Sequence, residues 1–313
     1  MKKFFVCLLV FLLLFFSLCF PQEAIRASKE GMQLWLNVLF PTLLPFLILT
    51  GFLIKTNVID RIFLPFRKTF RILFGLSAPG TYALLTGLLC GYPMGAKIAS
   101  DLYKEQKISR REAHYLLTFA NNASPAFLIN YLYISCLHKK VPLTLLLGTL
   151  FSSTFLCMLF FRFFVFHDLS DQNQTNIILK KETSACPPIG TLIDVSIMNG
   201  FETITRLGGY ILLFSLISAV IDHFSIFPIE IQLLLSGSSE LTTGLYKTAH
   251  SNMPFAFQYI VSMALTSFGG FSILAQTRSV ISNQLSITPY FLAKILNAGI
   301  TIVLVLITSR NYI

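Results

Sequence analysis

Polar residues interrupt hydrophobic stretches of this chain, and they are the residues best suited to bind a solute. Asn121 and Asn122 stand together in LLTFANNASPAFLI, with Ser124 and Pro125 close behind. Adjacent carboxamides facing lipid would be costly if unpaired, so they must meet protein, water or a ligand. Since an amide both donates and accepts hydrogen bonds, the asparagine pair suits an oxygen-rich solute, and we expect Ser124 to join it. A hydrogen bond between helices is the alternative for either asparagine.

A second polar group lies in the sequence SGSSELTTG, where Glu240 is the one acidic residue. We place Glu240 deep in a membrane segment, where an ionisable group is a functional-site hypothesis by default. It would couple to a proton or cation, or bind a donor group of the solute; the alternative is a carboxylate at a loop tip on the membrane surface. The neighbours expected to share a binding role are Gly237, Ser238, Ser239 and Thr243.

A third feature is the break Gly91-Tyr92-Pro93-Met94-Gly95, which follows the apolar run LLTGLLC. Pro93 cannot continue a helix, and the glycines permit a sharp reversal with close backbone approach. Irregular backbone at membrane depth is tolerated only where it is buried in protein or lines a cavity. We therefore expect Gly91, Tyr92, Pro93 and Gly95 to form a hairpin tip that contacts the solute.

Strongly basic segments flank this break on both sides. If 80–98 crossed the membrane, one of them would lie outside the cell, against the positive-inside tendency. A re-entrant hairpin over 80–98 returns both segments to the cytoplasmic side. The basic residues are Lys55, Arg61, Arg67, Lys68 and Arg71 before the break, and Lys97, Lys104, Lys107, Arg110 and Arg111 after it. Beyond them, Ser109 and Glu112 have the spacing of a capping box, which predicts a helix beginning at Ser109.

Signals for an enzyme or a metal centre are poor. The chain has no G-x-G-x-x-G, P-loop or H-E-x-x-H, and its five histidines show no ligand spacing. Ser238 lacks the G-x-S-x-G surroundings of a serine nucleophile. Its six cysteines contain no C-x-x-C. We expect no catalytic residue, no metal and no cofactor.

The composition determines which elements must position these residues. Of 313 residues, 54% are hydrophobic and 12% are charged, with a mean hydropathy of +0.71. This predicts an all-α polytopic membrane protein with about seven to nine hydrophobic segments, including re-entrant or broken helices. The net charge of +10 sits in short segments between apolar runs. It therefore favours cytoplasmic loops and a lipid bilayer as partner over nucleic acid. The expected segments are 33–54, 80–98, 113–137, 142–166, 203–222, 229–247, 255–282 and 288–309.

The long polar connection at 167–200 divides the membrane part into two similar halves. We expect an N-terminal helix and loop at 1–32, a first gate-like repeat at 33–166, the linker, and a second repeat at 201–313. The N-terminal apolar run is interpreted as a retained helix, with a cleaved signal peptide as the alternative.

The two halves correspond segment by segment. Residues 84–97 parallel 233–247 and 116–129 parallel 264–277, and these segments are interrupted in both halves. Paired interrupted segments are typical of transporter binding sites, with Gly and Pro used for helix packing as the alternative. Ser267, Gly269, Gly270 and Ser272 fall in the second half's interruption. Lys97 and Lys247 occupy matching hairpin ends, where they either attract an anion or reach to the membrane surface.

The sequences CGYPMGAK, DLYKEQKISRREAHYLLTFANNASPAFLI and SELTTG together resemble the sporulation integral membrane protein family of the YlbJ/SpoVV type, over about residues 35–305. That family is related to the gate modules of concentrative nucleoside transporters. Their re-entrant hairpins carry a G-x-S/T-E pattern similar to Gly237-Ser238-Ser239-Glu240.

The resemblance implies a spore-forming bacterium and residence in the outer forespore membrane. It implies movement of dipicolinate, a small dicarboxylate anion, toward the developing spore. The alternatives are a transporter of nucleosides or another small metabolite, and a non-transporting membrane scaffold for spore assembly. The partners expected are therefore a small-molecule anion and the lipid bilayer, and a homo-oligomer is compatible with the sequence.

Overall fold

The computed structural model describes residues 2–56, 67–167, 188–224 and 226–309. This part of the chain consists of helices and their connections and contains no β-strand. Four described helical segments are long and apolar enough to cross a membrane, and six if each of two sharply bent helix pairs counts as one span. The predicted all-α polytopic membrane fold is confirmed. The four segments are Leu143–Val165, Ile189–His223, Phe255–Val280 and Thr288–Thr308.

The two halves of the chain share part of the order of their described elements: a helix, a hairpin, an interrupted helix and a closing helix. The first half comprises α1 (Lys2–Cys19), α2 (Pro21–Leu34), the π-helical turn η1 (Trp35–Leu39), α3 (Phe40–Lys55), α5 (Arg67–Phe74), α6 (Ala78–Cys90), α7 (Met94–Lys104), α8 (Arg110–Phe119), η3 (Phe127–Cys136), α9 (Leu143–Phe160) and η4 (Phe161–Val165). The second half comprises α11 (Ile189–His223), α12 (Ile229–Ser239), α13 (Leu241–Ala249), α14 (Phe255–Phe268), α15 (Gly270–Val280) and α16 (Thr288–Thr308).

Each half contains a hairpin of two short helices whose close packing depends on glycine. In the first hairpin, a Cβ added at Gly87 of α6 would lie 2.7 Å from the Cα of Gly95 in α7. In the second, a Cβ at Gly244 of α13 would lie 2.0 Å from the Cα of Gly237 in α12. Only glycine permits two helix backbones to approach this closely, so glycine-to-glycine contact packs the helices in both hairpins. The chain reverses at Gly91, whose φ of +82° favours glycine.

Each half also contains a helix that is interrupted midway. The chain leaves the helical conformation after α8 and resumes it in η3, and Asn121, Asn122 and Ser124 lie in this gap. The second break lies between α14 and α15, at Gly269 and Gly270, with φ angles of +88° and +81°. Both predicted interruptions are therefore present.

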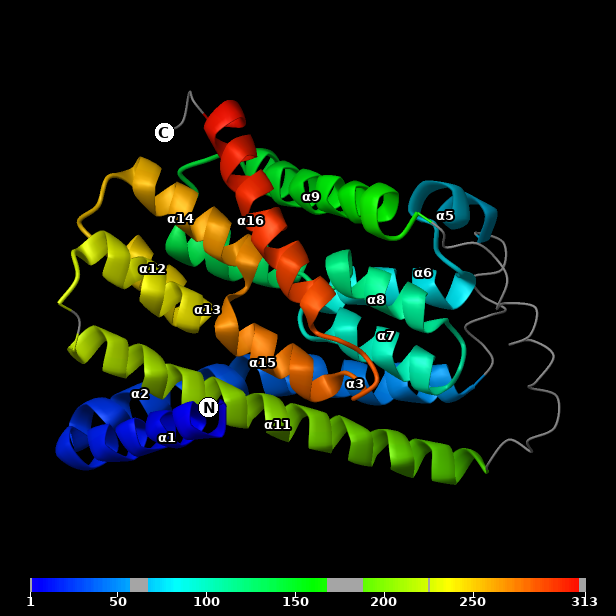
Figure 1. The fold of residues 1–313 in the computed structure, drawn as a ribbon, viewed down its shortest axis with the longest axis horizontal. Helices are drawn as coiled ribbons and strands as arrows, with labels where there is room; N and C mark the ends of the chain where they lie inside the picture. The colour runs from blue at the N-terminus through cyan, green and yellow to red at the C-terminus, as the bar shows by residue number, and fades with distance from the viewer. Residues whose placement is uncertain (1, 57–66, 168–187, 225, 310–313) are drawn as a thin grey trace.

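The equivalent helices of the two halves lie against each other. Helix α3 packs along α11, and α9 packs along α16. Figure 1 shows α9 and α11 along opposite long edges of the molecule, with the hairpins and interrupted helices between them and α16 crossing the other helices obliquely. The hairpins and breaks are therefore enclosed by the longer helices. The exact domain boundaries stay a prediction.

One expectation about local structure was wrong, and another held only in part. The predicted linker 167–200 is helical from Ile189, because Leu192, Ser196 and Gly200 recur at helical spacing and bury one face of α11. The predicted capping box is only half formed. Ser109 Oγ accepts a hydrogen bond from Glu112 N at 3.1 Å, but Glu112 Oε1 accepts bonds from Ser77 N and Oγ, both at 2.7 Å. Since Ser77 is the N-cap of α6, these two bonds attach Glu112 to the N-terminal end of that helix.

Candidate functional site

The tip of the first hairpin packs against the first helix break. A Cβ at Gly91 would lie 2.7 Å from Ser124 N, and one at Gly95 would lie 1.9 Å from the carbonyl oxygen of Ala120. These two glycines therefore provide close backbone contact. Ser124 Oγ accepts a bond from Phe127 N at 3.2 Å, which orders the start of η3. The structure thus brings Gly91, Gly95 and Ser124 together, as part of one packed junction.

Tyr92 connects this junction to the second half of the chain. Its hydroxyl donates a hydrogen bond to the carbonyl oxygen of Thr266 in α14, at 3.0 Å. A Cβ added at Gly269 would lie 3.7 Å from the Tyr92 ring, so the ring also borders the second helix break. Pro93 immediately precedes α7 and ends the reversal. The first hairpin tip therefore touches both interrupted helices.

The two predicted asparagines make different contacts. Asn121 is fully buried, and its Nδ2 donates to Thr277 Oγ1 of α15 at 3.1 Å. This bond joins the two interrupted helices. Asn122 Nδ2 donates to the carbonyl oxygen of Phe119 at 2.7 Å, and its Oδ1 accepts a bond from Lys294 Nζ at 2.7 Å. The interhelical alternative therefore holds for both residues in this conformation, and a role in solute binding stays a prediction.

Lys294 is the residue that reasoning from the sequence missed. It lies in α16 and is only 3% exposed, with its ammonium 5.4 Å from the centre of the Tyr92 ring and 5.5 Å from that of Tyr290. Among the described residues, no carboxylate lies within 4.0 Å of it. A lone charge in an otherwise apolar 21-residue helix is a signal that could have found it.

Beside Asn122 lies a small cavity, bordered also by Thr266, Ser267 and Asn297. Its volume is about 20 Å³. Such a cavity holds about one water molecule, so the described conformation is closed to a larger solute. Binding at this position requires the hairpin tip or a helix break to move.

The tip of the second hairpin packs against the second helix break. A Cβ at Gly270 would lie 3.1 Å from the carbonyl oxygen of Ser238 and 3.4 Å from that of Gly237. Ser239 Oγ is buried and has no hydrogen-bond partner within the described part of the chain. Each hairpin tip therefore packs against the interrupted helix of its own half, in keeping with the internal correspondence seen in the sequence.

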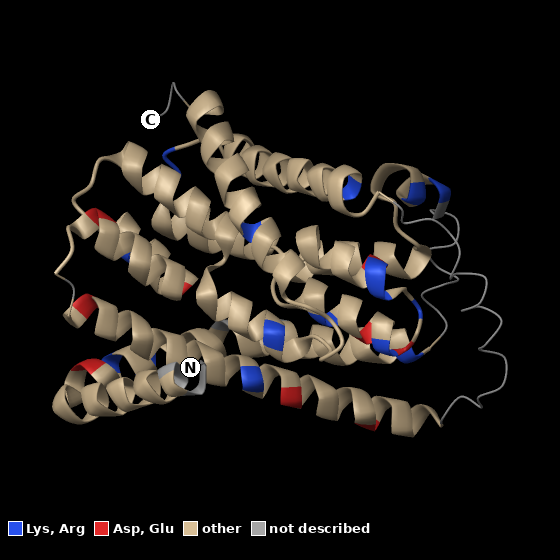
Figure 2. Cartoon of the chain, in the orientation of Figure 1, with Lys and Arg blue, Asp and Glu red and all other residues tan. Residues whose placement is uncertain are grey.

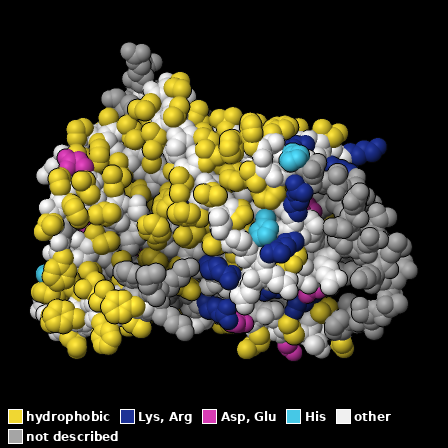
Figure 3. Space-filling view, in the orientation of Figure 1, with side chains coloured by type: hydrophobic (Ala, Val, Ile, Leu, Met, Phe, Trp, Pro, Cys, Tyr) yellow, Lys and Arg dark blue, Asp and Glu magenta, His cyan; other side chains and the backbone are white. Residues whose placement is uncertain are grey.

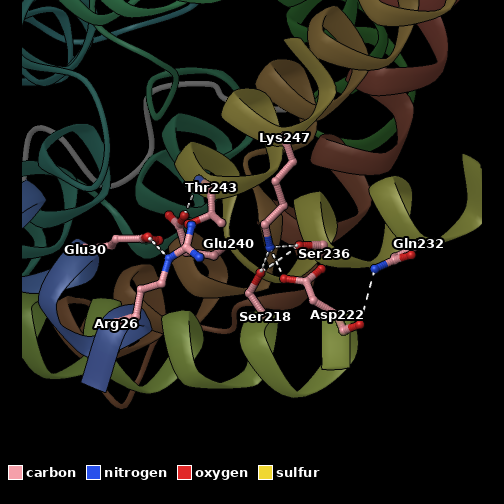
Figure 4. Close-up of polar contacts among 9 residues, drawn as sticks. All are labelled: Arg26, Glu30, Ser218, Asp222, Gln232, Ser236, Glu240, Thr243 and Lys247. Atoms are coloured by element: carbon pink, nitrogen blue, oxygen red, sulfur yellow. Dashed lines mark hydrogen bonds and ion pairs between the residues drawn. The ribbon is translucent and has the colours of Figure 1, made fainter. Parts of the chain in front are cut away.

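Glu240 is 5% exposed and begins α13, where its Oε2 accepts a hydrogen bond from Thr243 N at 2.6 Å. A carboxylate at this position stabilises a helix start by accepting from a free backbone N–H and by offsetting the helix dipole. Its predicted coupling role stays a prediction. Thr243 also borders a separate cavity between α2, α11 and α13. Figure 4 shows Thr243 next to Glu240. The predicted residues thus divide into a group around Asn122 and a group around Glu240.

The two lysines at matching hairpin ends are both paired with acids. Lys97 Nζ contacts Asp101 at 2.8 and 2.6 Å. Lys247 forms an ion pair with Asp222 of α11 and donates to Ser218 at 3.1 Å and to Ser236 at 2.9 Å (Figure 4). Lys247 therefore fastens the second hairpin to α11.

The comparisons with known proteins agree with this architecture. A family model described as "Gate: Nucleoside recognition" matches residues 36–165. The "Sporulation integral membrane protein YlbJ" of Bacillus subtilis (strain 168) is 25% identical over 323 residues, which cover 92% of this chain and 78% of that relative. The chain is therefore similar to a sporulation membrane protein over most of its length. No solved structure matches it.

The name of this relative describes an integral membrane protein, which agrees with the expectation that this chain is an integral membrane protein. The matched region 36–165 contains the first hairpin and the asparagine pair. Glu240 and Lys294 lie beyond it, in the second half. The candidate site is therefore assembled from the gate region and from elements outside that region.

Proposed function

We propose that this protein transports dipicolinate, a small dicarboxylate anion, across the outer forespore membrane toward the developing spore. The observation that carries the proposal is the buried ammonium of Lys294, bonded to Asn122 and without a carboxylate partner among the described residues. A buried cation is costly unless it is paired, so this position favours an anionic ligand. A sporulation relative and a gate family model support the setting.

The chemistry of dipicolinate suits the groups gathered here. It is a planar dianion with a carboxylate at each end. One carboxylate would bind Lys294, and the other would accept from an asparagine amide or from backbone N–H groups of the first turn of α15, which begins at Gly270. The aromatic rings of Tyr92 and Tyr290 flank Lys294 and offer flat apolar surface to the pyridine ring. Each part of the solute therefore has a matching group.

Access to this position requires a conformational change. The cavity beside Asn122 is only about 20 Å³, so the solute enters only when surrounding elements separate. The bond from Tyr92 to Thr266 joins the first hairpin tip to α14 and must break if that tip moves. Gly91, Gly269 and Gly270 have positive φ angles at these boundaries and can absorb backbone rotation. The hairpin tip would then act as the gate.

The decisive experiment is dipicolinate flux into vesicles that contain only this protein. We expect Lys294→Met to lower flux at low substrate by roughly 10- to 150-fold, the equivalent of one charged hydrogen bond. Lys294→Arg keeps the charge and should retain more activity. Lys29→Met is the matched control, because Lys29 is exposed on α2. Equal flux in the wild type and in a folded Lys294→Met variant would refute the proposed binding role.

A nucleoside is the second candidate substrate, favoured by the description of the matching family model. A neutral nucleoside does not require a cation for charge compensation. Nucleoside flux that survives in Lys294→Met, with no dipicolinate flux in the wild type, would establish this alternative. If the folded protein moves neither solute, the membrane scaffold remains. Microscopy of a fluorescent fusion during sporulation tests the location in the outer forespore membrane.

A further inference from the structure

A large open groove lies between α7, α11 and the C-terminal end of α15, apart from the small cavity beside Asn122. It has a volume of about 930 Å³, and Lys97, Lys104, Arg206 and Arg278 line it. A smaller recess of about 230 Å³ continues from it and shares Lys97 and Lys104. Figure 2 shows basic residues on α11 and α15 where these helices run side by side, and Figure 3 shows Lys and Arg side chains gathered on this face.

The groove carries more positive charge than its acidic neighbours neutralise. Lys97 is paired with Asp101, and Arg206 forms an ion pair with Glu202. Lys104 and Arg278 have no carboxylate within 4.0 Å among the described residues.

The contacts of Arg278 are long and made only to neutral groups. Its guanidinium reaches the carbonyl oxygen of Ser282 at 3.5 Å and Asn283 Oδ1 at 3.4 Å. These distances lie at or beyond the usual limit of an N–H···O hydrogen bond. The side chain thus retains most of its capacity to bind an anion.

The position of these cations is unusual for a membrane protein. Arg206 lies near the middle of the 35-residue α11, and Arg278 lies close to the end of the candidate span Phe255–Val280. Charged residues within spans mark water-filled cavities and ion or substrate pathways. The groove therefore contains an exposed arginine from the middle of one candidate span and another from the end of a second.

Helix α15 forms a wall between the groove and the candidate site. Thr277 is buried and accepts the hydrogen bond from Asn121, whereas the next residue, Arg278, is exposed and lines the groove. Adjacent residues of one helix thus face the two regions. A movement of α15 would therefore alter the groove and the candidate site together.

We propose that this groove binds small dianions and delivers them to the site around Lys294. A cleft lined by one sign of charge raises the local concentration of oppositely charged solutes and speeds their capture. This inference rests on the proposed anion transport and deepens it by assigning the entry site. The ligand class is an oxyanion with two carboxylate or phosphate charges, taken from solution and not from a lipid headgroup.

Protection of arginine from chemical modification tests the binding step without requiring transport. The purified protein in neutral detergent is treated with phenylglyoxal, with and without dipicolinate at constant ionic strength, and modified peptides are quantified by mass spectrometry. We expect dipicolinate to slow modification of Arg206 and Arg278 by about threefold to tenfold. Arg26 is the matched control, because it is exposed and also pairs with a glutamate four residues away. Equal rates at all three arginines would overturn the inference.

Two further arms separate the source of the anion and the proposed function. In nanodiscs, protection that depends on anionic lipid and not on dipicolinate would assign the groove to lipid headgroups and overturn the inference. In vesicles, Arg278→Gln should raise the half-saturating dipicolinate concentration by about fivefold and leave the maximal flux intact. An unchanged half-saturating concentration would contradict delivery through the groove. Arginine protection together with absent wild-type flux would support the binding step while refuting transport.

Discussion

The replacement of Gly95 by alanine tests how the first hairpin is held against the first helix break. The added Cβ would lie 1.9 Å from the carbonyl oxygen of Ala120, 2.6 Å from its carbonyl carbon and 3.2 Å from Asn121 N. All three atoms belong to the backbone, so no side-chain rotation relieves the clash. The hairpin and the break must therefore separate by more than an ångström. Overpacking of this kind costs about 1–3 kcal/mol.

Gly148→Ala is the control, because no heavy atom lies within 4 Å of the Cβ that would be added in α9. That variant should gain up to about 1 kcal/mol from helix propensity. Thermal unfolding in detergent should place Gly95→Ala about 2–6 °C below the wild type and Gly148→Ala at or slightly above it. If the two variants unfold at the same temperature, the close packing of α7 on Ala120 is refuted.

Three other substitutions test the remaining contacts. Tyr92→Phe removes the bond to Thr266; we expect a loss of about 1 kcal/mol in thermal unfolding and faster opening in cysteine accessibility, and unchanged accessibility would contradict its role in closure. Lys247→Met leaves the Asp222 carboxylate without its ion-pair partner; we expect a loss of about 1–3 kcal/mol, which Asp222→Asn in the same chain should partly restore, and no restoration would argue against a direct pair. Glu240→Gln should abolish any pH dependence of flux while the amide oxygen still caps α13, and a retained pH dependence would leave Glu240 as a helix cap only.

The placement of the broken segments was largely predictable from local sequence. Pro93 and the neighbouring glycines cannot continue a regular helix, so the break between α6 and α7 follows from their covalent structure. The asparagine pair followed by Ser124 and Pro125 marked the first helix break, between α8 and η3, in the same way. The start of α11 was missed because the polar linker was extended to residue 200, although residues 189–200 are rich in apolar side chains and their buried residues recur at helical spacing.

The partners of the polar residues were not predictable in this way. Thr277 lies 156 positions after Asn121, and Lys294 lies 172 positions after Asn122. Such pairs depend on how the two halves of the chain pack. The sequence around each asparagine does not indicate which distant residue it will contact. Glu112 is a further example: local spacing predicted a capping box, whereas the structure directs its carboxylate to Ser77 because α6 begins next to it.

The sequence by itself determined the membrane class, the helical fold and the positions where helices break, because hydropathy and backbone chemistry act locally. Tertiary structure decided which of those breaks meet, and it brought the cation of Lys294 to Asn122. It also placed Glu240 apart from Asn122 and Lys294, although Glu240 and Asn122 each lie at or next to a break in a helix. The physical reason is that burial and pairing of polar groups depend on distances through space, which are set only when α16 and the hairpins pack together.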